Sequence, residues 1–351
     1  MYTNELGSYC SNNNIIKIIL LNKHYYKQIN VDVYNNNKYY YKQINVDVYK
    51  CIDQKKLYNN KIKNILCHEI HYEIKNIDHL YKLKELSIKN NFKLKCDLKK
   101  LTKIVKLCCL NCPKIKNINY LYNLKKLSCD STSMIDQNDI KRSTNLIKLI
   151  CSYNSKIVNA NHLYKLKELH CEGTSGIGQN GIRKLTGVVK LSCDYNKNIT
   201  DINHLYKLKE LDCERNSGIS QNGIRKLTGI VKLSCDYNKN ITDINHLYKL
   251  KELNCESNSG INQKGIKFLT KIVRLTCNYN NKIKDVNHLC NLKKLHCIFN
   301  TGIDQNGIKN LTKIIELKCD DNKKITDVNH LNNITKLSCI GDSGIDQYGI
   351  K

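Results

Sequence analysis

Apolar residues recur along this chain at spacings that repeat with a fixed period. The pattern Leu-x-x-apolar-x-x-Leu-x-Cys-x-x-Asn-x-x-Ile begins at Leu185 and begins again at Leu205. Residues 227–268 then repeat residues 185–226 with only seven substitutions. Self-similarity at such short periods is typical of solenoids, in which each repeat is one structural unit. The pattern therefore predicts one elongated array instead of several globular domains.

Thirteen units follow one another in register over residues 80–351, and the last one is incomplete. After a first step of 21 residues, the spacing alternates between 20 and 22 residues. The first positions are Leu80, Leu101, Leu121, Ser143, Leu163, Leu185, Leu205, Leu227, Leu247, Leu269, Leu289, Leu311 and Leu331. A single Leu-x-x-Leu spacing occurs by chance in any helix, but thirteen in register are specific for a repeat architecture.

A short strand is predicted around the third leucine of each unit. In the segment from Glu210 to Glu214, Leu211 and Cys213 alternate with polar residues. Successive side chains of a strand point to opposite faces, so leucine and cysteine face the core and the other three residues face outward. Stacked units would then build a parallel sheet.

The skeleton resembles the leucine-rich repeat, and its two connection lengths resemble two of the known subtypes. The shorter connection, NKNITDINHL at 196–205, resembles the SDS22-like subtype, which implies a 3₁₀ turn on the convex side. The longer one, SGISQNGIRKL at 217–227, resembles the cysteine-containing subtype, which implies a short α-helix from about Gln221 to Leu227. The resemblance implies an α/β solenoid, an arc with a parallel concave sheet and an alternating 3₁₀ and α-helical convex side.

Two segments precede the regular units. Residues 1–56 lack the repeat, but the sequence YYKQINVDVY occurs at 25–34 and again at 40–49. Alternating apolar residues and an Asn-rich gap favour a β-hairpin over 25–49 that caps the array, whereas a duplication in a flexible segment is the alternative. Residues 57–79 are interpreted as a degenerate repeat.

Cysteine, asparagine and histidine follow the repeat in three columns. Cysteine stands two residues after the strand leucine in twelve of the thirteen units. A single column facing a packed core does not supply four tetrahedral ligands, so we interpret it as buried apolar cysteine and expect no metal site. The asparagines are expected to bond backbone groups and the histidines to pack in turns. No cofactor is expected.

The overall charge raises a different possibility. The chain has 58 Lys and Arg against 31 Asp and Glu, which gives a net charge of +27. Such a charge favours nucleic acid or another anionic partner, although an AT-rich coding sequence would produce the same excess of Lys, Asn and Ile. The first residues lack the pattern of a signal peptide, and no apolar stretch is long enough to span a membrane. These features, with the cysteine column, favour a soluble cytoplasmic protein.

The residues that face outward from the strands form the concave surface of a solenoid, which is its usual recognition surface. Among the fifteen such positions between residues 168 and 256, nine are acidic and two are lysine, with Ser192 and Ser234 among the rest. A tyrosine follows in every second unit. We therefore predict a concave partner site made of Glu168, Glu172, Asp194, Tyr195, Glu210, Asp212, Glu214, Asp236, Tyr237, Glu252, Glu256, Tyr153 and Tyr279.

These features together favour a non-enzymatic scaffold that binds a protein with a basic or partly apolar segment. A substrate adaptor of a ubiquitin ligase is the alternative that the cysteine-containing units imply. Binding of nucleic acid or an anionic surface through lysine-rich edges is a further alternative, although the acidic concave surface disfavours nucleic acid there. The composition and the recent duplications resemble leucine-rich-repeat families of large DNA viruses or AT-rich protists, which implies a host-cell cytoplasmic protein if the gene is viral.

Overall fold

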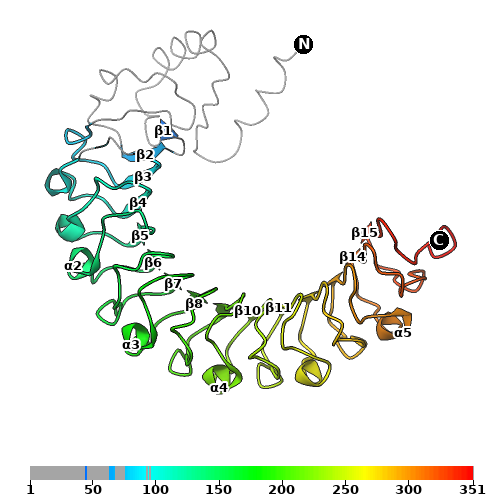
Figure 1. The fold of residues 1–351 in the computed structure, drawn as a ribbon. Coiled ribbons are helices and arrows are strands. Elements are labelled where there is room, and N and C mark those ends of the chain that lie inside the picture. Colours follow the sequence, from blue (N-terminus) through cyan, green and yellow to red (C-terminus); the bar gives the residue numbers. More distant parts are fainter. Residues whose placement is uncertain (1–43, 46–62, 68–75, 92–93, 95, 351) are drawn as a thin grey trace, which may run out of the picture. The chain divides into compact units, whose positions relative to one another are not determined.

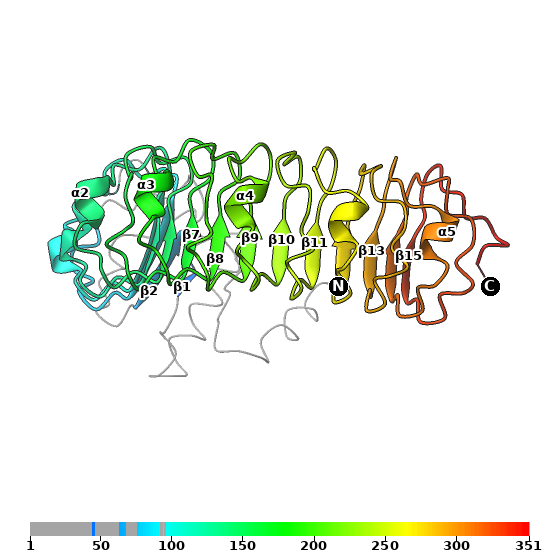
Figure 2. The ribbon, with the colours of Figure 1, turned by 90° about the horizontal axis from the view of Figure 1, so that it is seen from below.

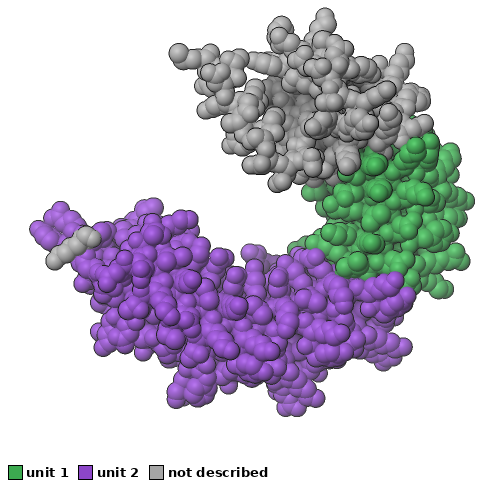
Figure 3. Space-filling view, turned by 180° about the vertical axis from the view of Figure 1, so that it is seen from behind, with its two compact units in different colours: residues 1–157 green, residues 158–351 purple. Residues whose placement is uncertain are grey.

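A computed structural model describes the chain except for residues 1–43, 46–62, 68–75, 92–93, 95 and 351. The chain divides into two compact units, residues 1–157 and residues 158–351, which Figure 3 distinguishes by colour. Each unit is a stack of short parallel strands joined by turns and short helices. Within the described residues, no helix is long and apolar enough to cross a membrane.

Unit 1 contains six of these strands in its described part. They are β1 (Ile44–Asn45), β2 (Asn64–Cys67), β3 (Glu85–Lys89), β4 (Lys106–Leu110), β5 (Lys126–Ser128) and β6 (Lys148–Ile150). Each pairs in parallel with the next, and the strand leucines of β3 to β6 stand opposite one another, in register with Ile44 of β1 and Ile65 of β2. The connections contain the 3₁₀ helices η2 (Leu98–Lys100) and η3 (Ile118–Tyr120) and the α-helix α2 (Gln137–Ile140).

Unit 2 contains nine strands, which lie on the inner side of its curve in Figure 1 and side by side in Figure 2. They are β7 (Glu168–His170), β8 (Lys190–Ser192), β9 (Glu210–Asp212), β10 (Lys232–Ser234), β11 (Glu252–Asn254), β12 (Arg274–Thr276), β13 (Lys294–His296), β14 (Glu316–Lys318) and β15 (Lys336–Ser338). All pair in parallel with their neighbours. The outer side carries α3 (Gln179–Ile182), α4 (Gln221–Ile224), η4 (Lys264–Ile266) and α5 (Gln305–Ile308).

The core of unit 2 consists of the predicted leucines, cysteines and isoleucines. Leu211, Cys213 and Ile219 are each 0% exposed, and the equivalent residues of the neighbouring repeats are buried in the same way. The thiols also donate hydrogen bonds along the stack. Cys213 Sγ donates to the carbonyl of Ser234 at 3.5 Å, and Cys193 Sγ donates to that of Asp212 at 3.6 Å. The predicted parallel solenoid and its buried cysteine column are thus confirmed.

The outer connections differ in length from the prediction. Helix α4 ends at Ile224 instead of Leu227, because Leu227 N–H bonds the Ile224 carbonyl at 2.9 Å and the Leu227 side chain enters the core. One long connection forms the 3₁₀ helix η4 instead of an α-helix. In the short connections of unit 2 the expected 3₁₀ geometry is limited to single turns, such as Leu205 N–H to the Ile202 carbonyl at 2.9 Å.

Glutamine at the start of the long connections fastens one repeat to the next. The side chain of Gln221 donates from Nε2 to the Asp243 carbonyl at 2.6 Å and accepts from the Thr242 N–H at 3.0 Å. Gln179, Gln263 and Gln305 make the same pair of contacts with their following turns. The repeats are therefore held together on the outer side by side-chain amides as well as by the core.

The asparagine column has the predicted structural role in the short units only. Asn238 is buried, and its Nδ2 donates to the carbonyls of Cys213 at 3.0 Å and Ile219 at 3.2 Å. In the long units, Asn216 and its equivalents Asn258 and Asn300 are exposed. The longer turn moves the buried position on by one residue, where Ser217 Oγ contacts Cys193 Sγ at 3.7 Å.

Histidine takes the predicted place in the turns of unit 2. His204 Nε2 lies 3.0 Å from the Ile182 carbonyl of the preceding repeat, and His246 Nε2 lies 3.1 Å from that of Ile224. A carbonyl only accepts, so Nε2 carries the proton in these bonds. The column joins consecutive repeats.

Little of the prediction for the N-terminal segment falls on described residues. Ile44 and Asn45, in the second copy of the duplicated sequence, form β1 and pair in parallel with β2. The rest of the proposed hairpin over 25–49 lies outside the described residues. Within the proposed degenerate repeat, β2 pairs in parallel with β3 and Ile77 is 0% exposed. The boundaries of the predicted array remain predictions.

Candidate functional site

The first outward position on strands β7 to β12 alternates between glutamate and a basic residue. Lys190 Nζ lies 3.0 Å from Glu210 Oε2, and Lys232 Nζ lies 4.0 Å from Glu252 Oε2. Such partly exposed pairs contribute little to stability, but they offset the charge of Glu210 and Glu252. Both glutamates lie on the concave surface as predicted. Because their charges are offset, the net negative charge of that surface comes mainly from carboxylates that follow the ends of the strands.

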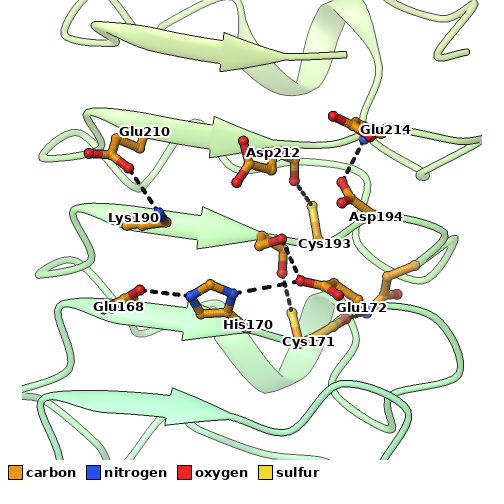
Figure 4. A network of polar contacts seen from close by, with 12 residues as sticks. Glu168, His170, Cys171, Glu172, Lys190, Cys193, Asp194, Glu210, Asp212 and Glu214 are labelled. Carbon is orange, nitrogen blue, oxygen red and sulfur yellow. Dashed lines mark hydrogen bonds and ion pairs between the residues drawn. The ribbon is translucent and has the colours of Figure 1, made fainter. Parts of the chain in front are cut away.

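Histidine joins two of the predicted glutamates at β7. His170 Nε2 lies 2.8 Å from Glu168 Oε1, and His170 Nδ1 lies 3.6 Å from Glu172 Oε1 (Figure 4). Glu168 therefore belongs to a local network with its own strand. Glu172 also accepts a hydrogen bond from Ser192 Oγ of the next strand at 2.7 Å.

The carboxylate row, as we name it, consists of Glu172, Asp194, Glu214, Asp236 and Glu256, which follow β7 to β11 in order. Asp194 Oδ1 accepts from the Glu214 N–H at 2.8 Å, a bond drawn in Figure 4, and Asp236 Oδ1 accepts from the Glu256 N–H at 2.7 Å. The aspartates thus hold the turn of the next repeat. Asp212 lies beside the row at the end of β9.

Burial and mutual repulsion make the aspartates of this row weak acids. Asp236 is only 8% exposed, and burial together with the charges of Glu214 and Glu256 raises its pKa to about 7. Burial and the charges of Glu214, Glu172 and Asp212 raise the pKa of Asp194 to about 6. A cation placed at the row would favour the ionised form of both aspartates.

An aromatic side chain follows the carboxylate row in every second repeat. Tyr195, Tyr237 and Tyr279 are 46%, 46% and 51% exposed, and they have φ angles of 58°, 56° and 58°. This left-handed conformation costs an ordinary L residue roughly 1–2 kcal/mol. Gly173, in the longer turn after β7, has a similar φ of 61°, and glycine adopts this conformation without steric cost. The turn geometry therefore does not account for the tyrosines.

Two further side chains extend this aromatic row. The ring of Phe299 stacks on that of Tyr279 with centroids 4.4 Å apart and an interplanar angle of 14°. The Arg215 guanidinium carbon lies 5.6 Å from the Tyr195 ring centroid, and Arg215 Nη1 donates to Tyr195 Oη at 3.0 Å. We call Tyr195, Tyr237, Tyr279 and Phe299 the aromatic row. Its three tyrosines were predicted, whereas the role of Arg215 was not.

Two of the predicted outward positions face the concave side but are covered by neighbouring side chains. Ser192 is 3% exposed and Ser234 is 6% exposed, because the side chains of Glu172 and Glu214 lie across them and accept their hydroxyl hydrogen bonds. Both serines therefore support the carboxylate row and are not contact residues. Tyr153, with 48% exposure and φ 61°, has the same local conformation but belongs to unit 1 and is described with that unit.

Lysines occupy the turns that precede the strands of unit 2. The nine segments between the first leucine of each repeat and its strand contain nine lysines and no Asp or Glu. The exposed rings of Tyr206 and Tyr248 lie here, with Lys207 and Lys249 Nζ each 5.9 Å from the neighbouring ring centroid. Opposite charges are thus segregated, with carboxylates beyond the ends of the strands and lysines before their beginnings.

The buried thiols have no reactive character. Burial raises the pKa of Cys193 and of Cys235 to about 12, so both stay protonated at neutral pH. Among the described residues, no group of three or more His, Cys, Asp or Glu side chains is arranged to hold a metal ion.

Several solved structures have a fold similar to that of this chain. The functional domain of InlJ from Listeria monocytogenes, described as including a cysteine ladder, superposes with a TM-score of 0.59 at 23% identity. The match covers 80% of this chain and 63% of that one. The fold is that of a leucine-rich repeat. No protein-family model matches the sequence, and a search of curated proteins found no match.

Two further leucine-rich-repeat structures agree with this result. A leucine-rich repeat protein of Leptospira interrogans matches with a TM-score of 0.57 at 21% identity, over 85% of this chain and 82% of that one. An internalin from Listeria monocytogenes matches with a TM-score of 0.52 at 20% identity, over 84% and 88%. At these identities the likeness establishes the leucine-rich-repeat fold and leaves the partner to be argued from the site.

Proposed function

We propose that this leucine-rich-repeat protein is a non-enzymatic scaffold that binds a basic segment of another protein on the concave surface of unit 2. The observation that carries the proposal is the carboxylate row beside the aromatic row on a chain whose net charge is +27. Desolvated carboxylates attract a cation, while partly exposed tyrosines offer apolar area with a polar tip. A lysine or arginine side chain has both a charged head and an apolar stem.

The first test uses an oligolysine peptide of about ten residues as the probe, with affinity measured by fluorescence anisotropy at low salt. A triple variant, Glu214→Gln, Asp236→Asn and Glu256→Gln, removes three carboxyl groups from the carboxylate row. Its control, Asp201→Asn, Asp243→Asn and Asp285→Asn, removes three charges from the convex turns. The control carboxylates are exposed, and each accepts a backbone N–H two residues on, which an asparagine oxygen can also accept.

We expect the carboxylate-row variant to bind oligolysine at least about tenfold more weakly than the parent. The convex control should lose about twofold or less, since exposed charges act only through screened long-range fields. Equal losses in the two variants would mean that the peptide responds to net charge alone. The concave binding site would then be wrong.

The lysines that precede the strands support a second candidate, the binding of an anionic polymer along that edge. Exposed tyrosines between lysines are the side chains on which the bases of single-stranded nucleic acid stack. Affinity for random single-stranded DNA should then fall steeply with salt, and it should fall further in a Tyr206→Ala, Lys207→Ala variant. An affinity that barely changes with salt would rule this candidate out.

The remaining alternatives stay predictions. A role as substrate adaptor of a ubiquitin ligase is supported only by the resemblance of the long units to the cysteine-containing subtype. A cytoplasmic location, in the host cell if the gene is viral, is supported by a column of buried thiols that a reducing compartment would preserve.

A further inference from the structure

The chemistry of the concave surface repeats with every second strand of unit 2. Asp194 and Asp236 are 42 residues apart in sequence and follow β8 and β10, and each is followed by a tyrosine. Glu172, Glu214 and Glu256 recur at the same interval after β7, β9 and β11. One binding module therefore consists of a glutamate from one strand and an aspartate and tyrosine from the next.

The spacing of these modules along the sheet follows from strand geometry. Neighbouring strands lie about 4.8 Å apart, so equivalent groups of successive modules lie about 9.6 Å apart. A chain in the polyproline II conformation advances about 3.1 Å per residue and has three residues per turn, so every third side chain lies on the same face, about 9.3 Å from the last. A β-strand alternates its side chains between two faces, so only two- or four-residue spacings, about 6–7 Å or 13 Å, lie on one face. Only a three-residue spacing matches the modules.

We propose that the partner segment is a chain in the polyproline II conformation that crosses the strands and carries a lysine or arginine at every third position. This inference rests on the proposed function, and it specifies the register of the partner on the same surface. Each basic head would meet the carboxylates of one module, Glu172 with Asp194 and then Glu214 with Asp236. The stem in the second module would lie against Tyr237, whereas in the first it would lie beside Arg215, which already covers the Tyr195 ring.

The third module should bind a basic residue less strongly. Its glutamate, Glu256, accepts a hydrogen bond from Asn278 Nδ2 at 3.0 Å, and Asn278 stands where the other modules have aspartate. Beyond it, Ile298 stands where the modules have glutamate, and Lys294 and His296 of β13 pair with Glu316 of β14 at 2.7 Å and 3.0 Å. The row thus offers two strong positions and one weak one, and the segment that fits it is about seven to nine residues long.

The test compares two isomeric peptides that contain three lysines among the same glycine, serine and threonine residues. In one peptide the lysines stand at every third position, and in the other at every second position. The two peptides have the same net charge, length and composition, so only the spacing of the lysines differs. We expect the peptide with lysine at every third position to bind the parent protein about tenfold more tightly, because its lysines match the spacing of the modules. A third peptide, helix-forming and with lysine at every seventh position, advances about 10.5 Å per repeat and tests a helical partner.

A double-mutant cycle then locates the register. Replacing the middle lysine of the three-residue-period peptide by serine should weaken binding to the parent, but much less to Asp236→Asn, because the two groups interact. The matched protein control is Asp243→Asn, on the convex turn, for which the peptide change should cost as much as in the parent. Coupling of about fivefold or more with residue 236 and none with residue 243 supports the register.

The outcomes separate this inference from the function on which it rests. If the isomeric peptides bind equally while the carboxylate-row variant still loses oligolysine affinity, the three-residue register is wrong and the concave site stands. If the helical peptide binds most tightly, the extended partner is wrong. If oligolysine affinity does not depend on the carboxylate row, the proposed function itself is wrong.

Discussion

Asp236→Asn should stabilise unit 2 by an amount that grows with pH. The carboxyl of Asp236 has its pKa raised from 3.8 to about 7 by burial and by Glu214 and Glu256. Between these two values the folded protein keeps a proton that the unfolded chain has lost. The contribution of this carboxyl to the free energy of unfolding is therefore highest at low pH and falls as the pH rises toward 7. Asparagine has no such dependence.

The magnitude follows from the two pKa values. From pH 5 to pH 7 the unfolded carboxyl is ionised and the folded one is mostly protonated, so the slope is about 1.4 kcal/mol per pH unit. The free energy of unfolding of Asp236→Asn, relative to the parent, should thus increase by about 2–3 kcal/mol over that range and level off by pH 8. The fold accepts the substitution, because Asn278 already accepts the equivalent backbone N–H, that of Ile298, at 2.9 Å.

The assay is urea unfolding followed by circular dichroism at pH 5, 6, 7 and 8, with the m-values compared at each pH. Unchanged m-values would show that the variant unfolds over the same surface as the parent. Asp243→Asn serves as the control, since it makes the same substitution on an exposed convex turn. If the advantage of Asp236→Asn over the parent is the same at pH 5 and pH 8, Asp236 is not held in a desolvated site and the reasoning fails.

Three further predictions concern the turns and the core. Tyr237→Gly should raise the free energy of unfolding by about 1 kcal/mol in thermal melts, because the left-handed turn suits glycine, and a loss of stability would contradict this. Gly223→Ala should cost about 3 kcal/mol in urea, since its Cβ would overlap the Thr200 carbonyl oxygen. Gly187→Ala, whose Cβ would meet its nearest atoms at 3.4 Å, is the matched control and should cost under about 1 kcal/mol. Among the described cysteines, Cys290 should react first with a thiol reagent, because it is exposed, and labelling of the buried column in native protein would contradict the packing.

The repeating core was predictable from sequence because each of its positions follows from one physical rule. Alternation within a strand places Leu211 and Cys213 inward, and the thirteenfold register excludes chance. The ends of the outer helices were less predictable. Whether α4 continues to Leu227 depends on how the chain re-enters the core, which is a tertiary effect that a local pattern does not encode.

The candidate site was predictable in outline but not in detail. Alternation correctly placed Asp194 and Glu214 on the concave side. It did not reveal that Glu172 covers Ser192 or that Lys190 pairs with Glu210, because both contacts join residues about twenty positions apart in sequence. The left-handed turn at the tyrosines also gave no signal, since a bulky residue is not what that conformation normally selects.

Two positions in each module carry a residue that the fold does not favour. At the aspartate position an asparagine accepts the same backbone N–H without a buried charge, as Asn278 does, and at the tyrosine position a glycine would adopt the left-handed φ without steric cost. Recent duplication alone would copy such residues, but it would not make them useful. The double variant Asp236→Asn, Tyr237→Gly separates the two explanations. A more stable protein that has lost oligolysine affinity means that these residues serve binding, whereas a more stable protein with full affinity means that duplication alone maintains them.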